Sequence, residues 1–472
     1  MKTFIKLAWR NIWRNKRRTF ITVTSIFIAV FLALIMRSFQ LGSYDNMINN
    51  VVQSFTGYIQ IHENGYWDDK TINNTMELND SLVLALEKAK NVSAAVPRLE
   101  SFALASSGVQ SKGALVVGID PVKENDLTHL DKKIIKYRLT DSVLESLIQE
   151  GMNKEFVETI KQNNKRSFTS KEKMVTGLTK LLGNDNMKLW VDKVTKHASI
   201  QGKYLKDDDH AVMIGDRLAR FLNLNVGDTL VLIGQGYHGI SAFGKYAICG
   251  LIKMPNPELD NKMIYMPLKE CQNMYSAYGR VSSVSLNLNK PNKLETSIAS
   301  VKSIVNEEQY EVMSWKEMLT ELVQQIESDN YSGLIMLYIL YIVIGFGVFG
   351  TVLMMTAERQ KEFGVMVAVG MKKLKLVVMV FLELLMLAIL GIFSGIVLSL
   401  PIIRYFTVNP VELSGEMAKM MENYGMEPVM PFAWQLDFFV NQGITVAIIV
   451  LIAFIYPLFK ISKLNVMKSI RG

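Results

Sequence analysis

Four long apolar stretches are the dominant pattern of this chain. They lie at residues 19–36, 330–357, 376–403 and 438–459. At about 1.5 Å per residue, each is long enough to cross, or nearly cross, a hydrocarbon layer of about 30 Å. A buried helix of a large soluble protein mimics one such run, but four together favour membrane helices. About 290 mostly polar residues separate the first stretch from the second, which predicts one large domain on a single side of the membrane.

The predicted fold class is an α-helical membrane protein with four transmembrane helices plus a large α+β extracytoplasmic domain between helices 1 and 2. The expected segments are an amphipathic N-terminal helix at 1–18, membrane helices at 19–41, 330–357, 376–403 and 438–459, the large domain at 42–329 with a helical insertion at about 131–196, a coupling loop at 358–375, an outer loop at 404–437 and a tail at 460–472.

Charge predicts which side each segment occupies. The three flanks at 1–18, 357–376 and 460–472 hold 16 Lys and Arg residues, and their only acids are Glu358 and Glu362. Lys and Arg next to membrane helices stay in the cytoplasm, so both termini and the loop after the second helix are expected inside, and the large domain outside. Topology therefore accounts for the net charge of +8, and nucleic-acid binding is not implied.

The N-terminal segment has two faces. Basic residues recur at every fourth position, at Lys6, Arg10, Arg14 and Arg18, and Trp9 belongs to an adjacent apolar face. This pattern predicts an amphipathic helix in the membrane surface, with cations toward anionic lipid. The candidate membrane-surface residues are Arg10, Arg14, Arg17 and Arg18. The apolar run that follows is long and lacks a small-residue cleavage site, so an uncleaved signal anchor is expected rather than a removed signal peptide.

The large domain mixes strand and helix patterns. Strand character is expected at 57–62, in several short strands over 96–119, and again at 211–214, 230–233, 246–254, 262–266 and 284–288. Charged helical patterns at 142–161 and 171–182 indicate the insertion. A helix at 315–328 runs toward the second membrane helix, which indicates a continuous helical stalk.

The side chains that usually carry chemistry form no recognisable site. The chain has no Walker-type phosphate loop, nucleophile elbow or zinc-protease motif, and the glycine-rich run 234–239 reads as a hairpin loop. The five histidines lack ligand spacing, so no metal, cofactor or catalytic residue is expected. The two cysteines, Cys249 and Cys271, form a disulfide or remain two buried thiols, and spacing does not decide between these alternatives.

The loop after the second membrane helix carries an acidic pair. Glu358 and Glu362 stand four residues apart, so they share one helical face inside an otherwise basic loop. This arrangement indicates a docking element. Equally well, the two acids could simply solvate the end of the helix and pair with basic residues of the same helix.

At this point the chain resembles the FtsX-like permease superfamily, which includes macrolide-exporter and lipoprotein-releasing permeases. The resemblance covers the whole chain except the insertion. The matching residues of the loop are Met354, Glu358, Arg359, Glu362, Phe363, Gly364, Ala368 and Gly370, those of the start are Ala8, Arg10, Asn11, Arg14, Lys16, Arg17, Arg18 and Thr19, and the end matches over 457–471. Departures are Gly350, Lys463 and Asn465, where many members have Asn, Arg and Pro.

The resemblance implies the membrane subunit of an ABC transporter in the bacterial cytoplasmic (inner) membrane. A separate cytoplasmic ATPase dimer would grip the loop, and the permease would pass its motion to the outer domain. The implied ATPase-coupling residues are Glu358, Arg359, Glu362, Phe363, Gly364 and Gly370, braced by the basic N-terminal helix. ATP hydrolysis would take place in the partner, so this chain is not expected to be an enzyme.

The third membrane helix carries a stripe at four-residue spacing, namely Glu383, Leu387, Gly391 and Gly395. Glycines permit close approach of a neighbouring helix, and a membrane acid is expected to face protein or a polar cleft. We therefore expect this stripe to pack against a second permease copy or a paralogue. Snorkelling of Glu383 to the cytoplasmic edge is the alternative, and a proton relay is disfavoured because the acid has no intramembrane partner in the sequence.

Three functions compete. The first is lipoprotein release or export of a hydrophobic substrate by mechanotransmission, with a lipoprotein or a periplasmic carrier as a further partner. The second is an FtsX-like regulator that transmits ATPase state to a cell-wall hydrolase, which the large outer domain disfavours. The third is a peptide-sensing permease, which four helices disfavour because such relatives usually have more.

Overall fold

The protein divides into two compact units in the computed structural model, which describes residues 2–162, 166–413, 415–423 and 428–465. The membrane unit comprises Met1–Asn46, Glu321–Glu412 and Val429–Gly472, and the sheet unit comprises Met47–Thr320 and Leu413–Pro428. The end of the predicted tail, with the closing motif residues from 466 onward, lies outside the described residues.

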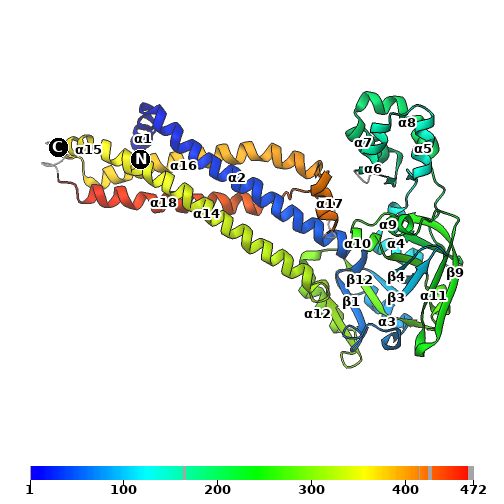
Figure 1. Ribbon diagram of the computed structural model, residues 1–472. Coiled ribbons are helices and arrows are strands. Elements are labelled where there is room, and N and C mark those ends of the chain that lie inside the picture. Colours follow the sequence, from blue (N-terminus) through cyan, green and yellow to red (C-terminus); the bar gives the residue numbers. More distant parts are fainter. Residues whose placement is uncertain (1, 163–165, 414, 424–427, 466–472) are drawn as a thin grey trace. The chain divides into compact units, whose positions relative to one another are not determined.

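The membrane unit is a bundle of long helices (Figure 1). Its helices are α1 (Lys2–Arg14), α2 (Lys16–Ile48), α14 (Thr320–Glu358), α15 (Gln360–Ala368), α16 (Lys373–Val408) and α18 (Leu436–Ser462). Four of them, α2, α14, α16 and α18, are long and apolar enough to cross a membrane. They carry the four predicted apolar stretches, so this part of the fold prediction is confirmed.

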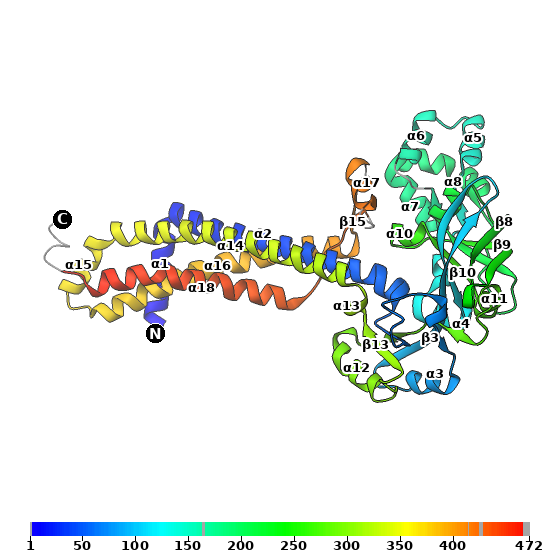
Figure 2. The ribbon, with the colours of Figure 1, turned by 60° about the horizontal axis from the view of Figure 1, so that its bottom comes forward.

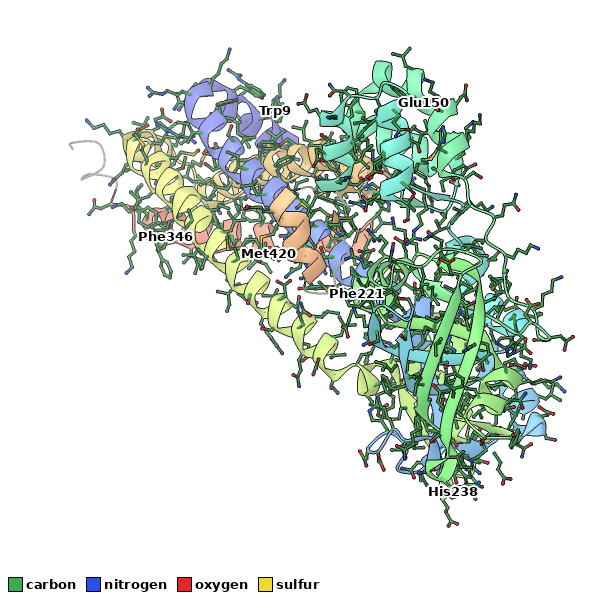
Figure 3. All side chains as sticks on the ribbon, turned by 45° about the vertical axis from the view of Figure 1, so that its right-hand side comes forward. Trp9, Glu150, Phe221, His238, Phe346 and Met420 are labelled. Atoms are coloured by element: carbon green, nitrogen blue, oxygen red, sulfur yellow. The ribbon has the colours of Figure 1, made fainter. Side chains whose placement is uncertain are left out.

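Each membrane helix is longer than its apolar stretch. The 39 residues of α14 correspond to about 58 Å, roughly twice the hydrocarbon thickness. The predicted stalk at 315–328 is part of this helix from Thr320 onward, after the short α13 (Trp315–Met318). Large apolar side chains such as Phe346, on the surface of α14 (Figure 3), remain exposed in the unit, as expected for helices that face lipid.

The glycine stripe of α16 packs against α2. A Cβ atom added at Gly391 would lie 2.5 Å from Ile26 Cγ2, and one at Gly395 would lie 2.8 Å from Val30 Cβ. The close helix approach that these glycines permit is therefore made within one subunit. Helix α16 also packs against α1 and α18, which places α16 in the middle of the bundle (Figure 2).

The sheet unit is built on one nine-stranded sheet of order β13-β1-β12-β3-β4-β10-β7-β9-β8. Its strands are β1 (Ile59–Glu63), β3 (Val92–Ser106), β4 (Ser111–Ile119), β7 (Ala211–Gly215), β8 (Thr229–Gln235), β9 (Ser241–Ile252), β10 (Met263–Pro267), β12 (Ser283–Leu288) and β13 (Tyr310–Ser314). Small two-stranded sheets pair β2 (Met76–Glu77) with β11 (Arg280–Val281) and β5 (Tyr137–Arg138) with β6 (Ser167–Phe168). A further small sheet, of β14 (Val411–Glu412) and β15 (Val429–Met430), belongs to the membrane unit.

Short helices fill the connections of this unit (Figure 1). They are α3 (Asp80–Glu87), α4 (Pro121–Thr128), α9 (Asp216–Phe221), α10 (Pro257–Asp260), α11 (Leu268–Met274), α12 (Leu294–Lys302) and α17 (Gly415–Asn423), with single 3-10 turns at Ile72–Asn74, Leu130–Lys133, Tyr237–Gly239 and Pro291–Lys293. Mixed helix and sheet agree with the predicted α+β domain, so the fold class as a whole is confirmed.

Strand β3 closes part of the sheet into a barrel. Along one edge its first half pairs with β12, and its last residues, Ala103–Ser106, pair with β8, while β4 occupies the other edge. Strands β3, β4, β10, β7, β9 and β8 thus form a closed ring. Its interior is filled by alternate apolar side chains of these strands, such as Leu99, Val116 and Leu232.

The outward side chains of the same strands include an exposed apolar row. Leu104 on β3 is opposite Ile233 on β8, and Ile233 is opposite Phe243 on β9. Phe102, two residues before Leu104, shares their face. All four side chains are at least 45% exposed, so they present a small apolar surface to solvent. We call these four residues the apolar row.

Two local expectations can be compared with this sheet. The run 96–119, expected as several short strands, instead forms the long antiparallel pair β3 and β4, because one turn at Gly108 (φ +88°) is the single reversal. The glycine-rich run 234–239 forms the turn of the β8–β9 hairpin, as predicted.

The region predicted as a helical insertion holds α5 (Asp141–Gln149), α6 (Lys154–Gln162), α7 (Lys171–Leu182) and α8 (Asn184–Ala198). These helices share an apolar core of their own, with Leu144, Leu178 and Val194 fully or almost fully buried. Arg138, at the start of this region, donates to the carbonyl of Leu224 at 2.8 Å, which fixes the region to the barrel.

Helix α2 continues into the sheet unit as η1, a π-helix at Asn49–Thr56. Its last three carbonyls each accept a hydrogen bond from a side chain of the sheet unit. Lys133 Nζ donates to Ser54 O at 3.2 Å, Arg98 Nη1 to Phe55 O at 2.5 Å and Gln60 Nε2 to Thr56 O at 2.6 Å. These carbonyls otherwise lack partners at a helix end, where cations are also favoured by the helix dipole. We call this arrangement the η1 joint.

Both cysteines are free. Cys249 is partly buried and donates to the carbonyl of Val212, whereas Cys271 is fully buried beneath β4 beside Gly118. Of the two alternatives left by the sequence, the structure therefore has buried thiols. Burial raises the pKa of Cys249 to about 12, which makes this thiol unreactive at neutral pH.

Candidate functional site

The loop between α14 and α16 contains the short helix α15, and α1 lies at the same end of the bundle (Figure 2). Arg359 is the one residue between α14 and α15, with φ −93° and ψ 7°. Helix α14 ends at Glu358 and α15 begins at Gln360, so the contacts of Arg359 act at the break between the two helices.

Arg359 binds two carboxylates. Its Nη1 donates to Glu383 Oε2 at 2.5 Å, and its Nε donates to Glu362 Oε2 at 3.2 Å. The other oxygen of Glu383 accepts from Asn11 Nδ2 at 2.6 Å, and both oxygens of Glu362 accept from Arg14 Nη2 at 2.7 and 2.6 Å. Because Asn11 and Arg14 belong to α1, these contacts form a closed ring of five side chains, which we call the polar ring.

The two acids of the predicted docking pair are bound inside the subunit. Glu358 pairs with Arg18 of α2, and Glu362 pairs with Arg14 and Arg359. Burial opposes the charge of Glu362, but the hydrogen bonds from Arg14 and Arg359 outweigh it, so the pKa of this carboxyl lies below its usual value. Both acids remain nearly half exposed, and these pairs hold the end of α14 against α2 and hold α15 against α1.

The other predicted coupling residues shape α15. Phe363 and Gly364 are buried against the bundle, and the guanidinium of Arg359 lies 5.3 Å from the centre of the Phe363 ring. Gly370 has φ +105° and ends the turn after α15, a conformation that favours glycine. The opposite face of α15 is exposed at Lys361, Val365 and Val369.

The basic N-terminal residues divide into two groups. Arg14 and Arg18 bind the acids of the loop. Arg10 and Arg17 are exposed, and so are Trp9, labelled in Figure 3, and Trp13, whose rings pack edge to face at 5.9 Å. Contact of α1 with anionic lipid stays a prediction for the exposed group.

Glu383 has partners that the sequence did not reveal. Arg359 and Asn11 both bind this acid, and its side chain is only 1% exposed. Snorkelling does not describe this buried position. Leu387, Gly391 and Gly395 are buried inside the subunit as well, so they do not by themselves require a second copy, and the dimer stays a prediction.

A second polar cluster joins α2 and α14 near their other ends. Arg37 Nη1 donates to Asn330 Oδ1 at 2.8 Å, Gln40 Nε2 to the carbonyl of Asp329 at 3.0 Å, and the Tyr44 hydroxyl to Asp329 Oδ2 at 2.7 Å. Sequence reasoning missed this cluster. Polar residues just beyond two apolar stretches were the available signal, but they did not identify the partners.

A family comparison covers the helices that carry this site. Residues 334–466 match the model of the family FtsX-like permease C-terminal. The C-terminal region is that of an FtsX-like permease. The match includes α15, Arg359 and Glu383, so the polar ring of this permease lies mostly within the family segment, and α1 supplies the rest.

Solved structures give distant similarities for the permease. The periplasmic region of MacB from Actinobacillus actinomycetemcomitans is 13% identical over 59% of this chain and 95% of that chain, with a TM-score of 0.32. The extracellular domain of the noncanonic ABC-type transporter YknZ from Gram-positive bacteria is 12% identical over 55% of this chain and 100% of that chain, with a TM-score of 0.29. A comparison with curated proteins gave no match.

Proposed function

We propose that this FtsX-like permease is the membrane subunit of an ABC transporter complex and that a separate ATPase docks on α15. The observation that carries the proposal is the two-sided character of α15. One side, with Phe363 and Gly364, is buried in the bundle, whereas Val369 on the outer side is 84% exposed.

An exposed apolar side chain at the tip of a basic loop is a plausible anchor for another protein. Lys361, Val365 and Val369 follow one another at four-residue spacing, so they share a face. The acids that the sequence favoured for docking have internal partners, which leaves this face to meet the ATPase. Glu358 and Glu362 then act by holding α15 in place.

The orientation follows from the charged flanks. Lys and Arg concentrate at both termini and in the loop around α15, which supports a cytoplasmic position for all three. The sheet unit then lies outside the cytoplasm, and the protein is a multi-pass component of a bacterial inner membrane. Energy for transport comes from the ATPase, since the chain itself lacks a phosphate-binding loop.

The substrate is proposed to be a lipoprotein or another hydrophobic compound, moved by mechanotransmission. The apolar row supports this class of substrate, because Phe102, Leu104, Ile233 and Phe243 offer a contiguous apolar surface on the barrel. The size of the sheet unit supports transport over regulation of a cell-wall hydrolase. A second permease copy or paralogue and a periplasmic carrier complete the proposed assembly.

The docking proposal is tested by changing Val369→Asp. Buried against an ATPase, a carboxylate at this position would be desolvated without a partner, so co-purification of the ATPase from native membranes should fall at least tenfold, while the amount of inserted permease stays constant. Met417→Asp is the control, because Met417 is also an exposed apolar residue, at 60%, but belongs to α17 in the sheet unit. Unchanged co-purification with Val369→Asp would reject α15 as the docking element.

The substrate proposal has its own test. Cells depleted of the permease should retain lipoproteins in the inner membrane or accumulate a hydrophobic compound. Correct lipoprotein placement together with normal export would reject both substrate classes and leave the regulatory and sensing alternatives.

A further inference from the structure

We propose that Glu383 is a positioning residue for the coupling loop and that, through the polar ring, it makes α1 part of the coupling apparatus. The proposal deepens the proposed function and rests on it for its meaning. Its physical content, however, concerns this chain alone and can be tested without an ATPase.

The ring connects three segments that are far apart in sequence. Glu383 on α16 binds Asn11 at 2.6 Å and Arg359 at 2.5 Å, and Glu362 on α15 binds Arg359 at 3.2 Å and Arg14 at 2.6 Å. Asn11 and Arg14 are three residues apart on α1, so they are neighbours on that helix. The chain of contacts therefore begins and ends on α1, through Asn11 and Arg14.

Burial makes Glu383 the fixed point of the ring. Its side chain is 1% exposed and that of Arg359 is 8% exposed, whereas Glu362 and Arg14 are about half exposed. A buried carboxylate is costly unless it is paired. Any movement that separates Arg359 from Glu383 would leave that carboxylate with Asn11 as its remaining donor. The pair thus opposes such a movement more strongly than the exposed contacts do.

The position of Arg359 turns this local pairing into control of a helix. Arg359 is the residue at which α14 ends and α15 begins. Its guanidinium binds one carboxylate on α16 and one on α15, a bridge that its planar fork of donors permits. Holding Arg359 therefore sets the direction of α15 relative to α16, and with it the direction of the exposed face at Lys361, Val365 and Val369.

The same ring explains why α1 belongs to the apparatus. Asn11 and Arg14 donate to the two carboxylates that Arg359 also binds. The ring contains two arginines and two carboxylates, so its charges balance. Each carboxylate has one donor on α1 and one from Arg359, so loss of either donor weakens the binding of that carboxylate. Displacing α1 would remove one donor from each acid, which loosens α15 without any change in α15 itself.

The test is hydrogen exchange of the full-length permease alone, in a lipid nanodisc, for wild type and Glu383→Gln. Glutamine keeps the shape but removes the charge that holds Arg359. We expect amides of residues 360–371 and of α1 to exchange at least about tenfold faster, as for loss of one partner of a buried pair. Thr351→Val is the control, because that hydroxyl donates to the carbonyl of Gly347 in its own helix.

A second variant separates positioning from general packing. Arg359→Lys keeps the charge but lacks the fork, so it should loosen the same peptides, and the double variant with Glu383→Gln should be no worse than the more severe single variant. Peptides of α18 should keep their wild-type exchange. Unchanged exchange at 360–371, additive effects in the double variant, or equal loosening of α18 would each overturn the proposal.

With an ATPase added, a further readout distinguishes the two proposals. Glu383→Gln should raise the permease concentration needed for half-maximal stimulation of ATP hydrolysis about tenfold and leave the maximal rate unchanged, because fewer molecules present α15 correctly. An altered maximal rate with unchanged half-saturation would contradict the positioning role. If Val369→Asp leaves ATPase association intact, the docking proposal fails, while the exchange result for the ring still stands or falls independently.

Discussion

The buried pair of Arg98 and Glu124 gives the most quantitative prediction for the sheet unit. Both side chains are fully buried, and Arg98 donates from Nε and Nη2 to the two oxygens of Glu124 at 2.8 and 2.7 Å. The third donation, to Phe55 O, belongs to the η1 joint. One guanidinium thus holds both α4 and the end of the first membrane helix.

Arg98→Met should destabilise the sheet unit by about 4 kcal/mol. Removing one partner of a buried ion pair costs roughly 3–5 kcal/mol, and the freed carbonyl of Phe55 adds to that cost. Thr128 Oγ1, which donates to Glu124 Oε1 at 2.9 Å, compensates in part. With a urea m-value of about 3 kcal/mol per molar, the unfolding midpoint should fall by about 1 M.

Pulse proteolysis of the full-length permease in detergent across a urea series measures this midpoint. The exposed pair of Lys123 and Glu87, at 2.9 Å, supplies the control, because Lys123→Met should cost less than about 1 kcal/mol. The double variant Arg98→Met/Glu124→Leu should recover part of the loss, since the buried carboxylate of Glu124 is then no longer left without its arginine. A single variant with the wild-type midpoint, or a double variant worse than the single one, would refute the reasoning.

Three further predictions concern other parts of the chain. Burial lowers the pKa of Lys133 from 10.5 to about 8, so the unfolded chain binds the proton more tightly than the folded chain. Between pH 8 and 10.5 the unfolding free energy of wild type should therefore rise relative to that of Lys133→Met. Parallel curves of unfolding free energy against pH would contradict this. Gly391→Leu should destabilise the bundle by about 1–3 kcal/mol in thermal unfolding because it overpacks α2, whereas Gly347→Leu, which has nothing within 4 Å of its added Cβ, should not. Cys249 and Cys271 should both resist a thiol reagent at pH 8 and react as two thiols after denaturation, and detection of fewer than two would indicate a disulfide.

Hydropathy was sufficient to predict the membrane helices because the apolar composition of each helix alone indicates that it lies in lipid. A run of apolar residues is stable in lipid whatever its neighbours are, so 330–357 and 376–403 could be assigned from local sequence. The same is true of the hairpin at 234–239, where glycines mark a turn between two strand patterns. These elements depend on interactions within a few residues.

The partners of polar side chains could not be predicted in this way. Glu383 and Arg359 are 24 residues apart, and they meet because α14 and α16 fold back on each other with a particular rotation. Hydropathy gives the depth of a residue in the membrane but not that rotation. The pairing of β3 with β8, which closes the barrel, could not be predicted for a similar reason. The sequence pattern of a strand does not identify the strand edge with which it pairs.

Helices α2 and α14 are joined at both ends, and this arrangement constrains how force could pass along them. Arg18 binds Glu358 at one end, and Tyr44 binds Asp329 at the other. The contacts are 26 residues apart on α2 and 29 apart on α14, or about 39 and 44 Å. Both distances exceed the hydrocarbon thickness of about 30 Å, so the span between the two contacts is long enough to cross the apolar layer.

A displacement of one helix should therefore carry the other with it. The polar ring belongs to the membrane unit and the η1 joint to the sheet unit, so the two sets of contacts can be tested separately. Glu383→Gln should loosen 360–371 without changing exchange in β3, and Arg98→Met should do the reverse. If either variant loosened both regions, the independence of the two sets of contacts would be refuted.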